Sequence, residues 1–355
     1  MKVALDATPL TEPTGGIARY TSELARALAE QFPSDEYWLL SDQRFSPPPG
    51  NLVNLKCGTG PRNMLERRWW LWGLQGEISR LRLDLFHGTD FAVPYIPLRP
   101  SVLTLHDLSP WGDTGWHNSA ERIRNRTPVL LRLGLVTMVI TPSEAVRKQA
   151  LTRFSLSPER VIAIPEAASP MFRPMAVREP AAPYFLHVGT LEPRKNIGLL
   201  VDAWREVRKR HHVNLVLVGR KREDFVELAS EPGLQLLGEV PDQRLPELYS
   251  GALAVAYPSL YEGFGLPVLE AMQCGAAVFT SLDPAISETA GGAAIQLDAS
   301  DRKAWVDALT AAVEHPEWLA GLRQKSLERA SQFSWGRTAA LTHDVYVEAR
   351  RRFAK

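Results

Sequence analysis

Short apolar runs alternate with helical patterns along this chain, and that alternation limits the folds it can adopt. In the first half these segments are residues 2–7, 17–29, 102–105, 138–141, 144–153 and 161–164. Strands of this length separated by helices predict βαβ units, and βαβ units predict a mainly parallel sheet. The expected fold class is therefore α/β with doubly wound, Rossmann-like domains.

The alternation is interrupted once, by a proline-rich segment. Five prolines fall between positions 165 and 183, a density that excludes a regular helix or a central strand and indicates a linker. The apolar runs then restart at 184–188, 214–218, 235–237, 253–257 and 277–280. The predicted organisation is a first domain at 1–168, a linker at 169–183, a second domain at 184–333 and a final helical stretch at 334–355.

Composition narrows the class of protein. A length of 355 residues with 45% hydrophobic content suffices for two packed cores, and a formal net charge of +1 gives no electrostatic case for a nucleic-acid partner. Two cysteines, Cys57 and Cys274, do not make a disulfide framework and suit a reducing compartment. The apolar stretch 129–140 is too short to span a bilayer and contains Arg132. We expect a cytoplasmic protein that is soluble or peripheral on the inner face of the membrane.

A glycine loop in the second half has the features of an anion site. It follows the apolar run 253–257 and precedes a helix that begins near Pro267. Gly263 and Gly265 have no Cβ, so a diphosphate can approach the amides of Phe264, Gly265 and Leu266 at the positive end of the helix dipole. A Gly-x-Gly loop before a helix is also often a simple turn.

Charged residues near this loop strengthen the anion-site interpretation. Glu270 lies about one turn inside the helix, where its carboxylate could accept hydrogen bonds from ribose hydroxyls. Arg194 and Lys195 follow the strand 184–188 and precede another helix. They therefore lie in the loop of a second strand–loop–helix unit. Ligands of open parallel sheets bind outside the carboxyl ends of the strands. Together with Glu262 at the loop, these residues predict a site for a sugar nucleotide.

These motifs resemble glycosyltransferase family 4, the retaining enzymes of GT-B fold. The resemblance rests on the run from Val188 to Asn196, on Pro258-Ser259, and on the run from Glu262 to Glu270; Thr14 to Tyr20 and His106-Asp107 fit the same family. It covers nearly the whole chain. It implies two Rossmann-like domains facing a central cleft, with an acceptor-binding first domain, a nucleotide-sugar-binding second domain, and a last helix that crosses back to the first.

The resemblance also implies roles for residues of the first domain. The loop containing Gly16 should approach the donor diphosphate, with Arg19 nearby on the acceptor side. His106, directly after the strand 102–105, should lie beside the donor sugar. Asp107 shares that position, although an Asp after a strand often caps the next turn. His87 could line the acceptor pocket or be only a packing residue.

The chemistry implied is transfer with retention of configuration, and no pair of carboxylates identifies a hydrolytic glycosidase. Arg194, Lys195 and the amides of the glycine loop would stabilise the departing diphosphate. Glu262 would hold a sugar hydroxyl and not act as a nucleophile. His211 and His212 are adjacent and do not indicate a zinc site, so we expect no metal. We expect no cofactor beyond the GDP- or UDP-linked donor.

Two recognition surfaces remain open at this stage. The segment 62–82 mixes arginines with Trp69, Trp70 and Trp72, which is typical either of an interfacial helix or of a helix packed on its own domain. The nucleobase is expected near Glu239 and Val240, through backbone groups.

The predicted function is transfer of a hexose, with mannose favoured, to a glycan or lipid-linked acceptor in bacterial polysaccharide or glycoconjugate synthesis. A sugar-nucleotide epimerase shares the fold and donor but needs no acceptor. A non-catalytic sugar-nucleotide-binding subunit is the other alternative. An NAD-dependent oxidoreductase would need a Gly-x-Gly-x-x-Gly fingerprint after the first strand, which is absent.

Overall fold

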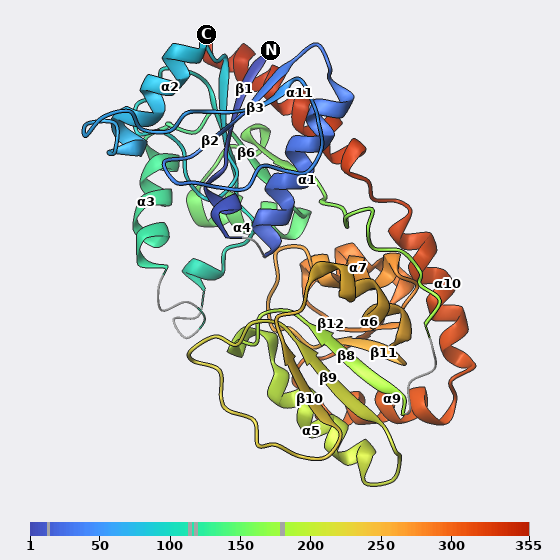
Figure 1. The fold of residues 1–355 in the computed structure, drawn as a ribbon. Coiled ribbons are helices and arrows are strands. Elements are labelled where there is room, and N and C mark those ends of the chain that lie inside the picture. Colours follow the sequence, from blue (N-terminus) through green and yellow to red (C-terminus); the bar gives the residue numbers. More distant parts are fainter. Residues whose placement is uncertain (13–14, 113–115, 117–119, 178–181, 355) are drawn as a thin grey trace. The chain divides into compact units, whose positions relative to one another are not determined.

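The chain divides into two compact units (Figure 1). Unit 1 comprises Met1–Ala167 and Ser334–Lys355, and unit 2 comprises Ala168–Phe333. The computed structural model describes residues 1–12, 15–112, 116, 120–177 and 182–354. Each unit is built around its own parallel sheet. The α/β fold class predicted from the alternation is confirmed.

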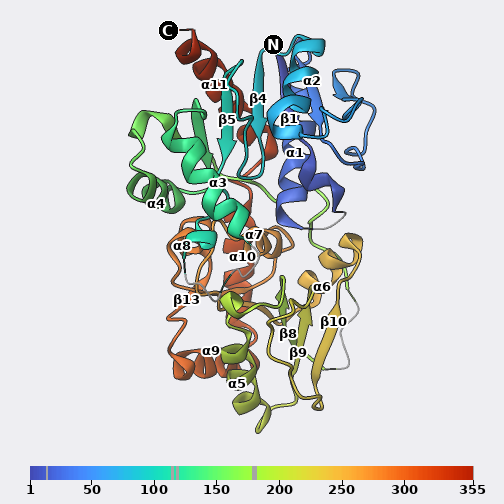
Figure 2. The ribbon, with the colours of Figure 1, turned by 90° about the vertical axis from the view of Figure 1, so that its left-hand side faces the viewer.

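The described part of unit 1 contains a seven-stranded parallel sheet with the order β3-β2-β1-β4-β5-β6-β7. The strands are β1 (Lys2–Asp6), β2 (Glu36–Leu40), β3 (Leu55–Cys57), β4 (Leu85–Gly88), β5 (Ser101–Thr104), β6 (Met138–Thr141) and β7 (Val161–Ala163). Figure 2 shows β5, β4 and β1 side by side. The chain winds outward from β1 in one direction and from β4 in the other, so the gap between them is a topological switch point.

Helices connect these strands, and one of them comes from the far end of the sequence. They are α1 (Gly16–Gln31), α2 (Leu74–Leu81), α3 (Glu121–Arg132), α4 (Glu144–Phe154) and α11 (Trp335–Phe353). α11 packs along α1, where the rings of Phe32 and His343 stack at 3.8 Å. Ser334 caps α11 by accepting a hydrogen bond from the Arg337 amide. The last helix is therefore part of unit 1.

Unit 2 has a six-stranded parallel sheet in its described residues, with the order β10-β9-β8-β11-β12-β13. The strands are β8 (Tyr184–Val188), β9 (Asn214–Val218), β10 (Leu234–Gly238), β11 (Ala254–Tyr257), β12 (Val278–Ser281) and β13 (Ile295–Leu297). The helices are α5 (Ile197–Arg208), α6 (Leu245–Gly251), α7 (Leu266–Gln273), α8 (Pro284–Ala290), α9 (Arg302–Glu314) and α10 (Trp318–Ala330). The switch point of this sheet lies between β8 and β11.

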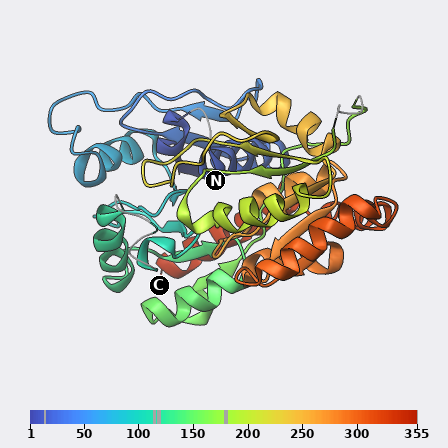
Figure 3. The same ribbon diagram turned by 90° about the horizontal axis from the view of Figure 1, so that it is seen from below.

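The core of unit 2 occupies both faces of the sheet, as expected for a doubly wound fold. Leu186 and Val188 of β8 belong to the cluster that contains α7, whereas Phe185 belongs to the cluster that contains α5 and α9. α5 and α9 pack against each other (Figure 3, yellow-green and orange-red). Alternate residues of one strand therefore fill opposite layers.

The segment predicted as a linker differs in part from that expectation. Phe172 is fully buried in the core of unit 2, against Tyr249. The Gln273 side-chain amide donates hydrogen bonds to the carbonyls of Ser169 and Phe172. The prolines limit regular structure but do not prevent an extended segment from packing. Residues 169–172 are therefore packed on the core of unit 2 and are not a free linker. Residues 178–181 lie outside the described residues.

Candidate functional site

Two loops of unit 2 meet at the switch point between β8 and β11. The first ends in a short 3-10 turn, Pro193–Lys195, and the second follows β11. Asn196, with φ +54°, donates side-chain hydrogen bonds to the carbonyls of Pro258 (3.3 Å) and Ala299 (2.8 Å). The Leu260 amide donates to the Arg194 carbonyl at 2.9 Å. The loops predicted to share one crevice are thus tied together by their backbones.

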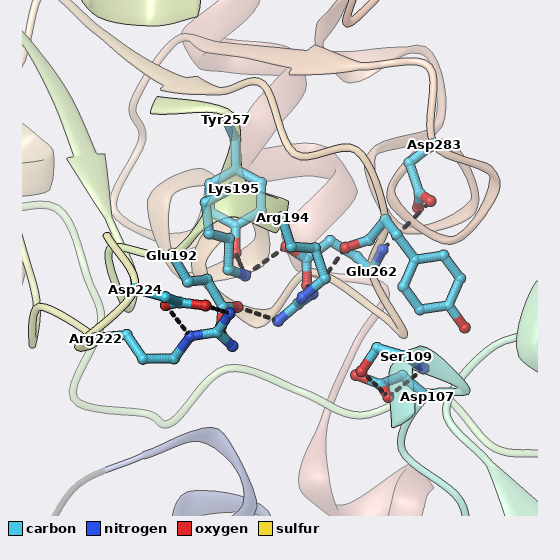
Figure 4. Close-up of polar contacts among 11 residues, drawn as sticks. Asp107, Ser109, Glu192, Arg194, Lys195, Arg222, Asp224, Tyr257, Glu262 and Asp283 are labelled. Atoms are coloured by element: carbon cyan, nitrogen blue, oxygen red, sulfur yellow. Dashed lines mark hydrogen bonds and ion pairs between the residues drawn. The ribbon is translucent and has the colours of Figure 1, made fainter. Parts of the chain in front are cut away.

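The two cations of the first loop contact a carboxylate of the second (Figure 4). Arg194 Nη1 lies 3.0 Å from Glu262 Oε2, and Lys195 Nζ contacts Glu262 Oε1. Lys195 Nζ also donates to the Tyr257 hydroxyl at 2.8 Å. All three charged residues are more than nine-tenths buried. The structure therefore brings together the three predicted residues Arg194, Lys195 and Glu262.

The ion-pair network extends beyond the residues that the sequence indicated. Arg194 Nη2 donates to Glu192 Oε1 at 2.6 Å, and Arg222 Nη1 donates to Glu192 Oε2 at 2.7 Å. Arg222 in turn forms a two-pronged pair with Asp224. Carboxylates and cations thus alternate from Asp224 to Lys195 (Figure 4). Glu192 lies in the run from Val188 to Asn196, after β8 and before α5. Its place in that run is the sequence feature that could have identified it as a site residue.

Burial and pairing shift the pKa values in opposite ways. Burial favours the neutral form of Glu262, but Lys195 and Arg194 outweigh it and lower the pKa of this carboxyl from 4.5 to about 2. Burial lowers the pKa of Lys195 even though Glu262 opposes the change. Burial, reinforced by the charge of Glu262, raises the pKa of the Tyr257 phenol well above 10.0. Glu262 is therefore an ionised acceptor throughout the physiological range.

The role expected for Glu262, holding a sugar hydroxyl, stays a prediction. In the structure its carboxylate is occupied by two cations. The physical reason is that buried charges need compensation, and an internal carboxylate supplies it when no ligand does. Glu262 stands where an external anion would pair with Arg194 and Lys195.

The glycine loop has the geometry of an anion-binding helix start. Gly265 adopts φ +91°, a left-handed conformation that side chains rarely tolerate, and it leads directly into α7. The Phe264 carbonyl accepts a hydrogen bond from the Thr289 hydroxyl at 2.7 Å, which fixes the loop on α8. The amides of Phe264, Gly265 and Leu266 donate to no residue that the structure describes. These amides therefore remain available to a ligand.

Three further side chains frame this mouth. Glu270 is buried in α7, and its carboxylate accepts a hydrogen bond from the Tyr249 hydroxyl at 3.1 Å. Asp283 caps α8 and also accepts from the Glu262 amide at 3.3 Å. Burial raises the pKa of Asp283 to about 6. Val240 is half-buried after β10. The roles expected for Glu270 toward ribose and for Val240 toward the base stay predictions.

In unit 1, His106 follows β5 at the carboxyl end of the sheet. Its Nε2 lies 2.8 Å from the Thr89 carbonyl and its Nδ1 lies 3.3 Å from Glu166 Oε1. The ring meets Tyr20 edge-on at 4.8 Å. Burial disfavours the charged ring, but the hydrogen bond and charge of Glu166 outweigh it and raise the pKa of His106 above 6.5. Each ring nitrogen of His106 therefore has an oxygen atom within hydrogen-bond distance.

Two predicted residues of unit 1 have structural contacts. Asp107 accepts hydrogen bonds from the Ser109 amide (2.9 Å) and hydroxyl (2.7 Å), which is the turn-capping alternative (Figure 4). His87 is fully buried, with its ring nitrogens 2.7 Å from the Tyr346 hydroxyl and 2.8 Å from the Thr104 hydroxyl. Burial lowers the pKa of His87 to about 3. This ring packs inside the unit, which agrees with the packing alternative stated for His87.

The loop before α1 is only partly described. Gly16 begins α1 and is exposed, and the Arg19 amide donates to the Gly15 carbonyl at 3.0 Å. Gly15 has φ +129°. Thr14, the first residue of this motif, lies outside the described residues. The donor role of Gly16 and the acceptor role of Arg19 stay predictions.

Two surveys of the described residues add to this picture. They contain no group of three or more His, Cys, Asp or Glu side chains arranged to hold a metal ion. None of the helices described has both the length and the apolar character needed to cross a membrane.

Comparison with known proteins identifies the two halves separately. The family described as Glycosyltransferase Family 4 matches residues 14–170, and the family described as Glycosyl transferases group 1 matches residues 174–332. The O-antigen chain mannosyltransferase B of Escherichia coli is 30% identical over 390 aligned positions, covering 98% of this chain and 99% of that protein.

Solved structures show the same architecture. Sucrose-phosphate synthase from Thermosynechococcus elongatus superposes with a TM-score of 0.76 at 20% identity, covering 99% of both chains. Anabaena HepE in complex with UDP-glucose superposes with a TM-score of 0.69 at 17% identity, covering 98% of this chain and all of that one. The expected GT-B fold is confirmed. With both halves matched and a full-length relative at this identity, the chain belongs to glycosyltransferase family 4 and is a glycosyltransferase.

Proposed function

We propose that the chain is a retaining, metal-independent mannosyltransferase that uses a GDP- or UDP-linked donor and extends a glycan or lipid-linked acceptor of a bacterial surface polysaccharide. The observation that carries the donor part is the buried pair Arg194 and Lys195 beside the unpaired amides of the glycine loop. Two cations and the free amides of a helix start, placed at one switch point, can together bind the negative oxygens of a diphosphate.

Donor binding would exchange one anion for another. In the structure described here, Glu262 neutralises Arg194 and Lys195. A diphosphate carries more negative charge than one carboxylate, so it would take over these cations and release Glu262 toward the sugar. This exchange reconciles the observed ion pairs with the hydroxyl-holding role expected of Glu262.

The transfer step needs no protein nucleophile. The bond between the anomeric carbon and the diphosphate oxygen breaks while the acceptor oxygen bonds to the same carbon from the same face. The acceptor proton passes to an oxygen of the departing diphosphate. Arg194, Lys195 and the loop amides face the oxygens on which negative charge develops, and each well-placed donor contributes about 3–4 kcal/mol.

The sugar and the pathway rest on similarity to relatives. The Escherichia coli relative that matches the whole chain is named as an O-antigen chain mannosyltransferase. A solved structure with the same fold contains UDP-glucose. Mannose as the sugar and surface polysaccharide as the product follow from the first of these, and the nucleoside is left to direct measurement.

A donor panel tests this proposal. Isothermal titration of UDP-, GDP- and ADP-sugars should show one donor that binds the wild type and that the double variant Arg194→Ala/Lys195→Ala loses. The matched control, Arg205→Ala/Lys209→Ala, removes two exposed cations of the same unit and should bind as wild type. Failure of every donor to bind would refute the proposal. Conversion of the sugar without any acceptor would instead identify an epimerase.

The segment 62–82 is the proposed point of contact with a membrane. Met64, Leu65 and Trp72 are exposed by 84%, 73% and 51%, next to exposed arginines at 67 and 68. Trp69, in contrast, is buried and packs inside unit 1. Apolar and cationic side chains on one segment suit an anionic lipid surface. Flotation with anionic vesicles should recover the wild type but not a Met64→Ser/Leu65→Ser/Trp72→Ala variant.

A further inference from the structure

Unit 1 contains a cavity of about 440 Å³ at the switch point of its own sheet. Asp6 ends β1 and Asp90 follows β4, the two strands that flank the switch point, and both residues line the cavity. Trp69, Trp70 and Tyr95 supply aromatic walls. A volume in the range of roughly 300–1,000 Å³ with aromatic walls is typical of small-molecule sites, and charged side chains, including Asp42 and four arginines, complete this lining.

Two polar atoms of this cavity lack hydrogen-bond partners among the described residues. Among the described residues, Asp90 Oδ1 and Arg126 Nε are both buried and form no hydrogen bond. The guanidinium of Arg126 lies 5.3 Å from the centre of the Trp70 ring, which holds it at the wall. A buried acceptor and a buried donor without hydrogen bonds each cost about 1–3 kcal/mol of stability. Two such atoms in one cavity therefore indicate a ligand that bonds to both.

The lining selects the chemistry of that ligand. It must donate a hydrogen bond to Asp90 and accept one from Arg126, which neighbouring hydroxyl groups do. Its body must pack on aromatic rings, as the carbon face of a pyranose does. A phosphate offers mainly acceptors, so it would leave Asp90 Oδ1 without a hydrogen-bond donor. The arginines at 67, 68 and 122 are exposed and belong to the rim.

We propose that this cavity binds the terminal pyranose of the acceptor glycan, and that Asp90 and Arg126 determine its specificity. The inference rests on the proposed function, because it assigns the cavity to the acceptor of that transfer. It goes beyond that function by placing acceptor recognition at Asp90, Arg126 and Trp70 and not at His87, which is buried with both nitrogens engaged.

Saturation-transfer NMR with methyl α-D-mannopyranoside tests the site on the full-length protein. The wild type should give sugar signals that Asp90→Ala and Arg126→Lys weaken by about tenfold or more. Lysine keeps the charge of Arg126 but cannot replace the Nε donor. If the sugar needed only the positive charge, the signal of Arg126→Lys would equal that of the wild type. The matched control is Glu30→Gln, an exposed carboxylate of α1 in the same unit, which should bind as wild type.

Separate readings keep this inference distinct from the proposed function. The same samples are titrated with the donor panel, and sugar binding is repeated in Arg194→Ala/Lys195→Ala to exclude a contribution from unit 2. Donor binding without any sugar signal, or equal signals in wild type and Asp90→Ala, would overturn the inference and leave the function intact. Displacement of the sugar by inorganic phosphate would overturn it in favour of an anion site. Thermal melting checks the folding of each variant.

Discussion

At the scale of single residues, the carboxylate of Glu262 determines what the two cations of unit 2 can bind. While it pairs with Arg194 and Lys195, the buried network stays balanced. An incoming anion has to compete with it. The residue therefore contributes to stability while no ligand is bound, and under the proposed function it would contribute to recognition afterwards.

Replacing Glu262 by Gln should separate these two contributions. The variant leaves two buried cations without this carboxylate, so we expect a loss of about 3–5 kcal/mol in unfolding free energy. The nucleoside diphosphate should then raise the melting temperature more than in wild type, while turnover falls. Differential scanning calorimetry with and without GDP or UDP measures both effects. Glu231→Gln, which breaks a partly exposed pair with Arg205, should cost no more than about 1 kcal/mol. Equal thermal shifts in wild type and Glu262→Gln would contradict the exchange of anions.

Asp6 gives a pH dependence of known sign. Burial raises its pKa from 3.8 to about 7, against the hydrogen bonds from Thr8. Between these values the folded chain keeps a proton that the unfolded chain has released. The unfolding free energy therefore falls as the pH rises from about 4 to about 7, by at most about 1.4 kcal/mol per pH unit for this group.

Asp6→Asn should remove that component, because the amide oxygen still accepts the Thr8 hydrogen bonds but carries no titrating proton. Urea denaturation of both proteins at several pH values provides the comparison. The unfolding free energy of Asp6→Asn should rise steadily relative to that of the wild type as the pH increases from about 4 to about 7. A constant difference would show that the carboxyl of Asp6 is already ionised at low pH.

Several site residues followed from the sequence because each lies in the loop at the carboxyl end of an apolar run. Arg194, Lys195 and His106 were found in this way. Asp6 and Asp90 satisfy the same rule and were missed, because a single Asp after a strand is an ordinary turn residue until the fold shows that two such strands are neighbours. A pairing partner such as Glu166 depends on a tertiary contact that no local pattern encodes.

At the scale of elements, the site depends on how two loops leave their strands. The start of α7 requires the left-handed conformation of Gly265, and the 3-10 turn before α5 ends in Asn196 with φ +54°. Both features aim backbone groups at the switch point. A change in either loop should alter ligand binding more than the loss of any surface contact.

Two glycine substitutions test this reading. Gly265→Ala should cost about 1 kcal/mol because alanine resists φ +91°, and it should weaken nucleotide binding by displacing the loop amides. Gly198→Ala is the matched control: it lies in the exposed first turn of α5, and an added Cβ meets nothing within 4 Å. It should gain about 0.5–1 kcal/mol and leave binding unchanged. Chemical denaturation and titration distinguish the two, and an unchanged Gly265→Ala would show that the loop tolerates the side chain.

The elements themselves were largely predictable where burial is two-sided. The strands at 184–188, 214–218 and 138–141 have the bounds expected of them, since both faces are covered and the runs are continuously apolar. β3 and β13 were not identified. They are three-residue edge strands with half-buried or exposed side chains, so they lack the apolar signal.

At the scale of the whole molecule, one unit is formed by a single segment of the chain and the other by two separate segments. Unit 2 is one continuous segment, Ala168–Phe333. Unit 1 needs α11, which buries Trp335 and Tyr346 and places the Tyr346 hydroxyl on His87. The final helical stretch was predictable from its periodicity, whereas the depth of its packing depends on partners more than 250 positions away.

Expressed alone, residues 168–333 should therefore fold cooperatively, and residues 1–167 should not. The first fragment keeps both faces of its sheet covered, whereas the second exposes the surface of α1 that α11 covers. Circular dichroism melts of the two fragments provide the measurement. Adding a peptide of residues 334–355 should restore a cooperative transition to the 1–167 fragment. A sharp transition in 1–167 without the peptide would show that α11 is dispensable.

The divided composition of unit 1 also sets an order of events during synthesis. A ribosome releases Met1–Ala167 first, but α11 leaves the exit tunnel only after all of unit 2 has been translated. The second unit can therefore reach its native state while the first still waits for its closing helix, so the order of folding is the reverse of the order of translation. In the interval, the apolar stripe of α1 that α11 covers in the folded protein stays exposed to solvent on the nascent chain.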